Sequence, residues 1–381
     1  MVPDEWDATR MIWLALLAAA TWVYLLGFHG QFWQAGPVLS PAVPRVAADV
    51  TIVVPARDEA GSITACLTSL LQQNYAGRFR IILVDDGSTD GTGAIARGLN
   101  DSRLTVLAGQ PRPARWSGKL WAIRQGIEAA ETSEFVLLTD ADIVHDPIHL
   151  STLVAQAELA GADMVSEMVE LACVSWAERA LVPAFVFFFQ LLYPFARVND
   201  PQSATAAAAG GTVLIRRRAL DRIGGIEAVR GALIDDVALA NAVKQGGRIW
   251  LGHSALARSI RPYPSAADVW RMIARTAYVQ LRFSPALLLA TTLGMALVWL
   301  VPLGLTLFGH GPTRLIGLLT WVAAMASYLP TLSRFRQSLL WALALPAVAC
   351  FYMAATIGSA VDHHLGRGVV WKRRAYQGMQ A

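Results

Sequence analysis

Three groups of acidic residues follow apolar or turn segments, and residues of this type can bind a metal ion or move a proton. The groups are Asp85-Asp86 after ILV, Asp140-Ala141-Asp142 after VLLT, and Asp235-Asp236 after a turn. Carboxylates that converge on one edge repel one another unless a divalent cation or a proton-transfer role accounts for them. The pattern therefore favours a metal-assisted enzyme over a binding shell.

The apolar runs that carry the first two groups alternate with helical stretches. Strand-like runs cover residues 51–56, 80–86, 104–108 and 134–142, and helical stretches start near residues 61, 90, 118 and 146. This alternation predicts an α/β fold with a mostly parallel sheet that is covered on both faces. Ligands of such sheets bind beyond the carboxyl ends of the strands. Those ends carry Arg57, Asp58, Glu59, Asp85, Asp86, Asp140 and Asp142.

The turn after Asp85 and Asp86 suits a nucleotide. In the stretch 81–92, IILVDDGSTDGT, a carboxylate can accept a hydrogen bond from the imide N–H of uracil or from a ribose hydroxyl. The small residues let the nucleotide approach the backbone. The same letters make a good turn and helix cap, so this stretch alone leaves both interpretations open.

Asp140 and Asp142 lie two residues apart in an extended segment. Hard oxygen ligands at this spacing can hold Mg²⁺ or Mn²⁺, which would neutralise a departing diphosphate, although surface loops also carry the spacing by chance. Lys119 lies in WSGKLWAIRQG at the start of a predicted helix, whose N-terminal amides favour anions. It is a candidate phosphate contact, against the alternative of a solvated lysine.

Asp235 and Asp236 begin an amphipathic helix predicted within residues 231–247. One of them can cap that helix, and the other can act as a general base.

The composition indicates a membrane protein. The chain of 381 residues is 55% apolar and 16% charged, which is too apolar for a wholly soluble protein. Four uncharged stretches are long enough to cross about 30 Å of hydrocarbon. They cover residues 11–28, 286–308, 315–333 and 338–361. An acidic leading segment without a nearby small-residue cleavage site favours a retained anchor over a cleaved signal peptide for the first stretch.

The net charge and the cysteines indicate the kind of partner and the redox compartment of the protein. The net charge is +4, and arginines concentrate after residue 215, which fits an anionic lipid surface better than nucleic acid. Cys66, Cys173 and Cys350 lack metal or redox spacing, so we expect a reducing compartment and neither a disulfide nor a zinc site.

Two further segments bear on the membrane. The aromatic-rich run 181–195 is either a core helix or a segment that dips into the lipid interface. Residues 266–283 form an amphipathic helix with Arg271 and Arg275 on one face and apolar residues on the other, and we expect this helix to lie along the membrane surface.

The predicted topology is only partly consistent with the positive-inside rule. A cytoplasmic domain places the acidic N-terminus outside and Arg334 and Arg336 inside. Three crossings after the domain would leave the basic residues of the tail outside. Either one C-terminal segment does not fully cross or the rule is broken, and the sequence leaves both open.

In their order and spacing these motifs resemble those of the family 2 glycosyltransferases. The strings LLTDADI, WSGKLWA and DDVALA, with the C-terminal spans, look most like the bacterial hopene-associated glycosyltransferases. The resemblance implies a GT-A fold, a nucleotide-diphosphate-sugar donor with uridine as the expected base, a divalent metal (Mg²⁺ or Mn²⁺) and inversion at the anomeric carbon. It also implies that Asp86 holds the nucleobase, Asp142 the metal, and Asp236 acts as the base beside Asp235.

The predicted donor site comprises Pro55, Arg57, Glu59, Asp86, Lys119 and Asp140, and Arg271 and Arg275 are assigned to the membrane and acceptor side. The interface helix has Thr276 where processive synthases and ceramide glucosyltransferases of this family have Trp, which disfavours a processive synthase. The tail reads W-K-R-R-A-Y, with Arg373 where many membrane members have Gly.

We therefore expect six segments. They are an N-terminal anchor over 1–35, a linker over 36–48, the GT-A domain over 49–262, an interface helix over 263–285, a transmembrane region over 286–361 and a basic tail over 362–381. The expected function is transfer of a sugar to a lipid hydroxyl, with a hopanoid implied by the subgroup, at a bacterial inner membrane with the catalytic domain in the cytoplasm. The alternatives are a polyprenyl-phosphate sugar synthase and a non-catalytic membrane scaffold.

Overall fold

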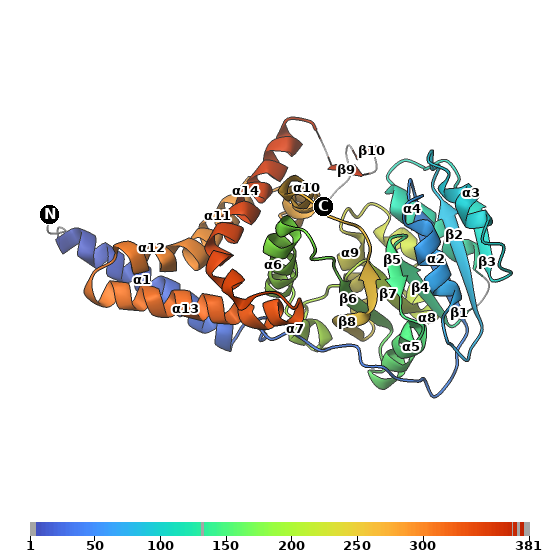
Figure 1. Cartoon of the computed structure of the whole chain (residues 1–381), viewed down its shortest axis with the longest axis horizontal. Helices are drawn as coiled ribbons and strands as arrows, with labels where there is room; N and C mark the ends of the chain where they lie inside the picture. The colour runs from blue at the N-terminus through green and yellow to red at the C-terminus, as the bar shows by residue number, and fades with distance from the viewer. Residues whose placement is uncertain (1–4, 131–132, 368, 372–373, 377–381) are drawn as a thin grey trace. The chain divides into compact units, whose positions relative to one another are not determined.

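The computed structural model describes residues 5–130, 133–367, 369–371 and 374–376, and the chain forms two compact units (Figure 1). The helical unit comprises the described parts of Met1–Ala35, Cys173–Ala196 and Tyr263–Gly368. The sheet unit comprises Gly36–Ala172, Arg197–Pro262 and the described parts of Val369–Ala381. Of the predicted anchor and tail, residues 1–4, 368, 372–373 and 377–381 lie outside the described residues.

The sheet unit is built on one eight-stranded sheet of order β3-β2-β1-β4-β7-β6-β8-β5. All neighbouring strands are parallel except at β7 and β5, which run antiparallel to their neighbours, so the predicted mostly parallel sheet is confirmed. The strands are β1 (Val50–Ala56), β2 (Phe79–Asp85), β3 (Leu104–Ala108), β4 (Phe135–Thr139), β5 (Ile143–His145), β6 (Met164–Glu170), β7 (Thr212–Arg216) and β8 (Ile249–Ser259).

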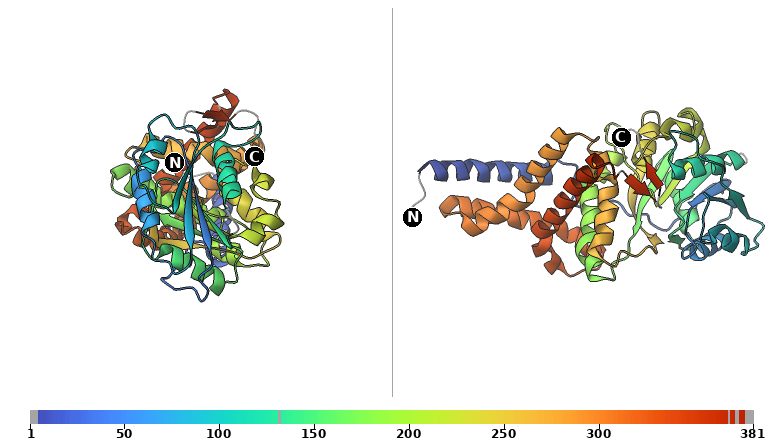
Figure 2. Two further views of the ribbon diagram at one scale, coloured as in Figure 1. Left: turned by 90° about the vertical axis from the view of Figure 1, so that its right-hand side faces the viewer. Right: turned by 90° about the horizontal axis from the view of Figure 1, so that it is seen from above.

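Helices cover both faces of this sheet, as the left panel of Figure 2 shows. On one face, Ile52 and Leu83 pack with Leu67 of α2 and Leu153 of α5. On the other face α4 lies close to β1, because a Cβ on Gly126 would stand only 2.4 Å from a Val53 methyl carbon. The helices of this unit are α2 (Ile63–Leu71), α3 (Thr92–Arg97), α4 (Gly118–Ala129), α5 (His149–Leu159), α8 (Arg217–Arg222), η1 (Ile226–Val229) and α9 (Asp235–Lys244). The short helix α7 (Phe195–Asn199) begins at the boundary of the two units.

The predicted linker is fixed to the sheet. Val38 forms a parallel bridge with His253 of β8. The Leu39 N–H donates to the His253 carbonyl at 2.7 Å, and the His253 N–H donates to the Pro37 carbonyl at 2.8 Å. These bonds satisfy backbone groups that a proline-rich segment cannot pair within itself.

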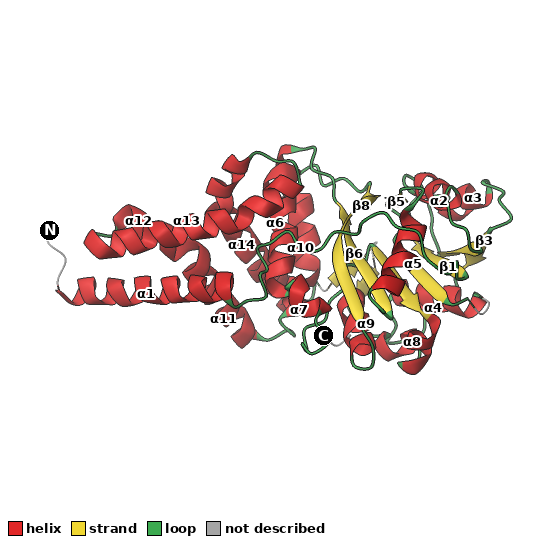
Figure 3. Cartoon of the chain, turned by 90° about the horizontal axis from the view of Figure 1, so that it is seen from below, coloured by secondary structure: helices red, strands yellow, loops and turns green. Residues whose placement is uncertain are grey.

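The helical unit contains four helical segments that are long and apolar enough to cross a membrane, and these match the four predicted stretches (Figure 3). They cover Thr9–Gly27, Pro285–Phe308, Gly311–Arg334 and Leu339–His364. Buried aromatic rings, among them Trp22, Phe187, Trp299 and Tyr328, form the centre of this unit. Its elements are α1 (Glu5–Gly27), α6 (Trp176–Leu192), α10 (Ala266–Gln280), α11 (Pro285–Met295), η2 (Ala296–Leu300), α12 (Val301–Phe308), α13 (Gly311–Arg334), η3 (Leu339–Ala344) and α14 (Leu345–His364).

The run 181–195 belongs to the core of the helical unit. Most of it lies in α6, where Ala184 and Phe187 are fully buried. Residues 173–196 therefore pack with the helical unit, whereas the sequence predicts one continuous domain over 49–262. The apolar face of α10 packs in the same core through Val269 and Ile273, so protein covers that face.

Candidate active site

The loops that follow β1 and β2 are tied together at the carboxyl edge of the sheet. The Thr89 N–H donates to the Asp58 carboxylate at 2.8 Å, and the Glu59 N–H donates to the Thr92 hydroxyl at 2.8 Å. Asp58 has a φ of +51°, a left-handed conformation that an aspartate tolerates better than most residues. The paired loops hold the predicted nucleotide-binding turn in one conformation.

Asp85 and Asp86 differ in their surroundings. Asp85 closes the turn by accepting a hydrogen bond from the Ser88 N–H at 2.9 Å. Asp86 is buried, with 5% of its surface exposed, and Arg57 Nη1 lies 3.9 Å from its carboxylate and donates to its backbone carbonyl at 2.5 Å. Arg57 and Asp86, both predicted donor-site residues, are therefore brought together.

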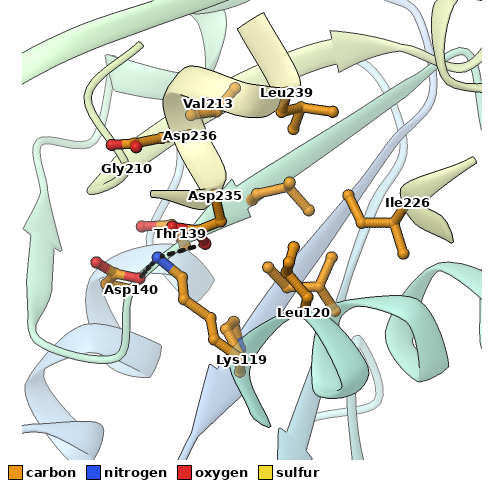
Figure 4. Close-up of a pocket in the computed structure, with 13 residues that line it drawn as sticks. Lys119, Leu120, Thr139, Asp140, Gly210, Val213, Ile226, Asp235, Asp236 and Leu239 are labelled. Carbon is orange, nitrogen blue, oxygen red and sulfur yellow. Dashed lines mark ion pairs between the residues drawn. The ribbon is translucent and has the colours of Figure 1, made fainter. Parts of the chain in front are cut away.

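Lys119 joins two acidic groups from different elements. It lies in the first turn of α4, which begins where the Ser117 hydroxyl accepts a hydrogen bond from the Leu120 N–H. Its Nζ lies 2.8 Å from an Asp140 carboxylate oxygen after β4 and 3.5 Å from an Asp235 oxygen at the start of α9 (Figure 4). These three residues are far apart in the sequence, and the cation holds the two carboxylates together.

A pocket opens beside this ion-paired group (Figure 4). It collects the predicted residues Pro55, Lys119, Asp140, Asp235 and Asp236, while Asp86 and Asp142 are not among the described residues that line it. Its lining consists of Pro55, Lys119, Leu120, Ile123, Leu138, Thr139, Asp140, Gly210, Val213, Ile226, Asp235, Asp236 and Leu239. An apolar wall with a few convergent charges is typical of a small-molecule site.

The environment of Asp236 shifts its acidity. Burial and the neighbouring Asp235 carboxylate raise the pKa of Asp236 to about 6, and Lys119 opposes part of this rise. The Val237 N–H donates to Asp236 at 2.8 Å, and a Cβ on Gly210 would stand 3.0 Å from an Asp236 oxygen, so a glycine there leaves room for the carboxylate. A carboxylate with a pKa near 6 in a pocket is suited to accept a proton near neutral pH.

The pKa values of Lys119 and Asp140 are both raised. Burial opposes the charge of Lys119, but Asp140 and Asp235 outweigh it and raise the pKa of the ammonium. Burial and the nearby Asp142 raise the pKa of the Asp140 carboxyl, while Lys119 lowers it in part. The site thus holds more negative charge than its lysine neutralises.

Asp142 pairs with an arginine that sequence reasoning missed. Arg261 Nε donates to Asp142 at 2.5 Å, and Arg261 Nη2 donates to Glu59 at 2.7 Å. Arg261 follows β8 in the string SIRPYP. Its place at the end of a strand-like run was the only available signal, since 119 residues separate it from Asp142.

A buried polar chain supports the turn that carries Asp140 and Asp142. The Thr139 hydroxyl contacts His145 Nε2 at 3.2 Å, His145 Nδ1 contacts His149 Nδ1 at 3.0 Å, and His149 Nε2 contacts Glu167 at 2.5 Å. Burial and His149 hold the pKa of His145 well below its usual value, which favours the neutral imidazole. The chain links β4, β5, α5 and β6 around the turn.

The residues present fit a divalent cation without forming a complete set of ligands. Among residues 9–130 and 133–367, no three His, Cys, Asp or Glu side chains are grouped to hold a metal. Asp140 and Asp142 nevertheless supply hard oxygens, and burial together with the nearby Asp142 carboxylate raises the pKa of Asp140, so a bound cation would favour its ionised form. Mg²⁺ is commonly held by one or two carboxylates together with substrate phosphates.

Arg271 and Arg275 lie on the exposed face of α10 in the helical unit, and Arg271 pairs with Asp268 at 2.5 Å. Their assignment to the acceptor side stays a prediction.

Known proteins share both the sequence pattern and the fold. Residues 51–224 match the family described as Glycosyl transferase family 2. Glycosyltransferase GlyG of Streptococcus pneumoniae is 31% identical over 118 residues, which are 30% of this chain and 37% of that protein. The 4,4'-diaponeurosporenoate glycosyltransferase of Staphylococcus aureus is 33% identical over 115 residues, which are 29% of each protein. These alignments span well under half the length of either relative.

A solved structure extends the comparison to nearly the whole chain. The mannosyltransferase PcManGT from Pyrobaculum calidifontis, in complex with GDP-Man and Mn²⁺, matches with a TM-score of 0.54 and 21% identity, over 94% of this chain and 96% of that one. At this identity the likeness concerns the fold, which agrees with the predicted GT-A sheet and its helices. The sheet unit therefore has the GT-A fold, and its residues 51–224 are similar in sequence to the family 2 glycosyltransferases.

Proposed function

We propose that this protein transfers one sugar from a nucleotide-diphosphate donor to a hydroxyl group of a membrane lipid, with inversion at the anomeric carbon. The observation that carries the proposal is the pocket in which Asp236, with a pKa of about 6, lies beside Asp235, Lys119 and Asp140. That pocket lies at the carboxyl edge of a mostly parallel sheet, where ligands of such folds bind.

In this mechanism Asp236 is the general base. At pH 7 a group with a pKa of about 6 is about nine-tenths ionised, so its carboxylate can accept the proton of the acceptor hydroxyl as that oxygen bonds to the anomeric carbon. The bond from the anomeric carbon to the diphosphate oxygen breaks on the opposite face, which inverts the configuration.

Lys119 and the paired loops would orient the donor. The Lys119 ammonium, already held between two carboxylates, presents positive charge where a diphosphate would develop negative charge on leaving. Asp86, buried beside Arg57, would accept a hydrogen bond from the nucleobase, which we propose to be uracil. Asp140 and Asp142 would hold Mg²⁺ or Mn²⁺, which supplies further neutralisation of the leaving diphosphate when bound.

Two observations support a lipid acceptor: the apolar helices of the helical unit and the named acceptor of one relative. The chain has four apolar helical segments long enough to cross a bilayer, and a relative is named for glycosylation of 4,4'-diaponeurosporenoate. We propose the inner membrane of a bacterium, with the sheet unit in the cytoplasm where nucleotide sugars are made. A hopanoid acceptor rests on the subgroup resemblance alone and is the first lipid to test.

The test is a transfer assay with the purified full chain. Detergent-solubilised protein is incubated with a panel of labelled nucleotide sugars and total bacterial membrane lipid, and the lipids that gain a hexose are identified by mass spectrometry. We expect a neutral lipid alcohol to gain one sugar with wild type and none with Asp236→Asn. Equal products from both proteins would contradict the assignment of the base.

The same assay separates the alternatives. A polyprenyl-phosphate synthase uses a phosphate oxygen that needs no strong base, so polyprenyl phosphate would be glycosylated and Asp236→Asn would reduce turnover only modestly. A scaffold without activity would neither transfer sugar nor hydrolyse any donor.

A further inference from the structure

Helix α6 has both of its ends joined to the sheet unit. The chain leaves that unit after Ala172, runs through α6, and returns to it at Arg197. With 17 residues at 1.5 Å each, α6 is about 26 Å long, shorter than the about 30 Å of a hydrocarbon core. A segment that starts from and returns to one soluble domain through a single helix of this length begins and ends on one side of a bilayer.

The segment α10 runs alongside α6. At its start, the Tyr263 N–H donates to Glu178 at 2.7 Å, in the first turn of α6. At its finish, the Tyr193 hydroxyl donates to Gln280 at 2.8 Å, just past the end of α6. The two helices therefore run parallel, with their starts side by side and their finishes side by side.

The apolar segment 339–364, which includes α14, follows the same course. Near its start, the rings of Trp341 and Trp176 contact at 5.6 Å, beside the start of α6. In its middle, the Tyr352 hydroxyl donates to the Leu181 carbonyl at 2.8 Å. The first half of this segment therefore lies along the first half of α6.

The finish of α14 lies at the finish of α10. The Ser359 hydroxyl donates to the Ala274 carbonyl at 2.5 Å, and the Tyr278 hydroxyl contacts His364 at 3.2 Å. The rings of Phe283 and His363 stack at 4.4 Å. The segment therefore runs from the start of the α6 and α10 pair to its finish, along helices that do not traverse a bilayer.

The other three apolar segments are arranged differently. In Figure 1 and in the right panel of Figure 2, α1, α12 and α13 lie side by side and extend away from α6, α10 and α14. The turn between α12 and α13, at Gly309 and His310, is at their far end. Two crossings after the sheet unit, by α11 with α12 and then by α13, would bring the chain back to its starting side.

We propose that the segment 339–364 does not cross the membrane but lies in its interface on the side of the sheet unit, with α6 and α10 on its protein face. Its outward face suits this role, because exposed apolar residues recur every three or four positions and form one stripe that can enter the lipid. The stripe includes Leu343, Ala347, Cys350, Ala354, Ile357 and Val361.

This course removes the conflict with the positive-inside rule. With three crossings in the whole chain, Arg334 and Arg336 and the basic residues of the tail lie on the sheet-unit side, and the GHGPT turn, followed by the single Arg314, lies opposite. A fourth crossing would place the tail, with Arg367, Lys372, Arg373 and Arg374, on the opposite side.

Single-cysteine labelling of the full-length protein tests the proposal. In a Cys173→Ser, Cys350→Ser background, in which the remaining Cys66 is fully buried, a membrane-impermeant maleimide is applied to sealed right-side-out and inside-out vesicles. We expect Arg367→Cys to label from the same face as Ser102→Cys in the sheet unit and Gln337→Cys after α13. His310→Cys should label from the other face. Labelling of Arg367→Cys from the same membrane face as His310→Cys would overturn the proposal.

A depth measurement provides a second, independent readout. Spin labels at Leu340→Cys, native Cys350 and Val361→Cys report their distance from the bilayer surface by power-saturation electron paramagnetic resonance. A segment in the interface places all three at a similar depth. A crossing segment would place position 350 about 15 Å deeper than the other two, since ten or eleven residues at about 1.5 Å each separate them. That second pattern would refute the inference even if the labelling were incomplete.

Discussion

The acid limb of the pH profile tests the proposed base most directly. The pKa of Asp236 lies about two pH units above the 3.8 of an ordinary aspartate, with burial as the larger cause and Asp235 as the second. Asp235→Asn removes that neighbouring charge and keeps the size of the side chain. We expect the acid limb of kcat/KM, near pH 6 in wild type, to move down by up to about one pH unit.

Lys119 supplies the opposite perturbation. Its ammonium lowers the pKa of Asp236, so Lys119→Met should move the acid limb to higher pH, whatever it does to the absolute rate. Lys119→Arg keeps the positive charge and serves as the matched control, with a limb close to that of wild type. The opposite signs distinguish an electrostatic effect from general damage to the site.

The assay is sugar transfer with limiting donor between pH 4.5 and 8, at constant ionic strength and saturating metal, because kcat/KM reports the ionisations of free enzyme and free substrate. Buffers overlap at each pH so that buffer effects are visible. An acid limb that stays in place or rises in Asp235→Asn would refute the reasoning. Lys119→Met and Lys119→Arg moving together would do the same.

Three further variants test the geometry of the site. Asp236→Asn should lower turnover by about 10² to 10⁴-fold with nearly unchanged donor affinity, read by single-turnover kinetics and calorimetry. Because the folded-state pKa of about 6 exceeds the ordinary 3.8, the free energy of unfolding contributed by Asp236 falls as pH rises through that window, so this variant should also be more stable than wild type at pH 8 in chemical denaturation. Asp142→Ala should abolish the metal-dependent part of donor binding; donor affinity that still rises with Mn²⁺ would remove Asp142 from that role. Arg261→Gln should weaken donor binding and lower stability by about 1 to 3 kcal/mol, because Asp142 loses its partner, whereas Arg258→Gln, at an exposed position near the end of β8, should change neither.

The sequence alone determined the elements and the edge at which the chemistry lies. Continuous apolar runs such as 51–56 and 135–139 have to be buried on both faces, which predicts parallel strands, and the acids that follow them then meet at one edge. Uncharged stretches of membrane-spanning length are equally direct signals, because they depend only on length and composition. These features are local, so they can be read without knowing any long-range contact.

The pairing of charges across the site was decided only by the tertiary structure. Lys119 could have been a solvated lysine, and its bridge between Asp140 and Asp235 depends on how α4, β4 and α9 converge. Arg261 carries no motif, and it meets Asp142 because β8 ends beside the turn after β4. The contacts of Lys119 with Asp235 and of Arg261 with Asp142 depend on packing between segments more than a hundred residues apart, which no local pattern encodes.

The same distinction holds in the helical unit. Hydropathy assigns the segments 311–334 and 339–364 to one class, because both are long and apolar. Their courses differ through particular contacts, such as that of Tyr352 with Leu181, which set α14 along α6. Composition determines whether a helix can enter a membrane, and its tertiary partners determine the direction in which it runs, because only they fix where each of its ends lies.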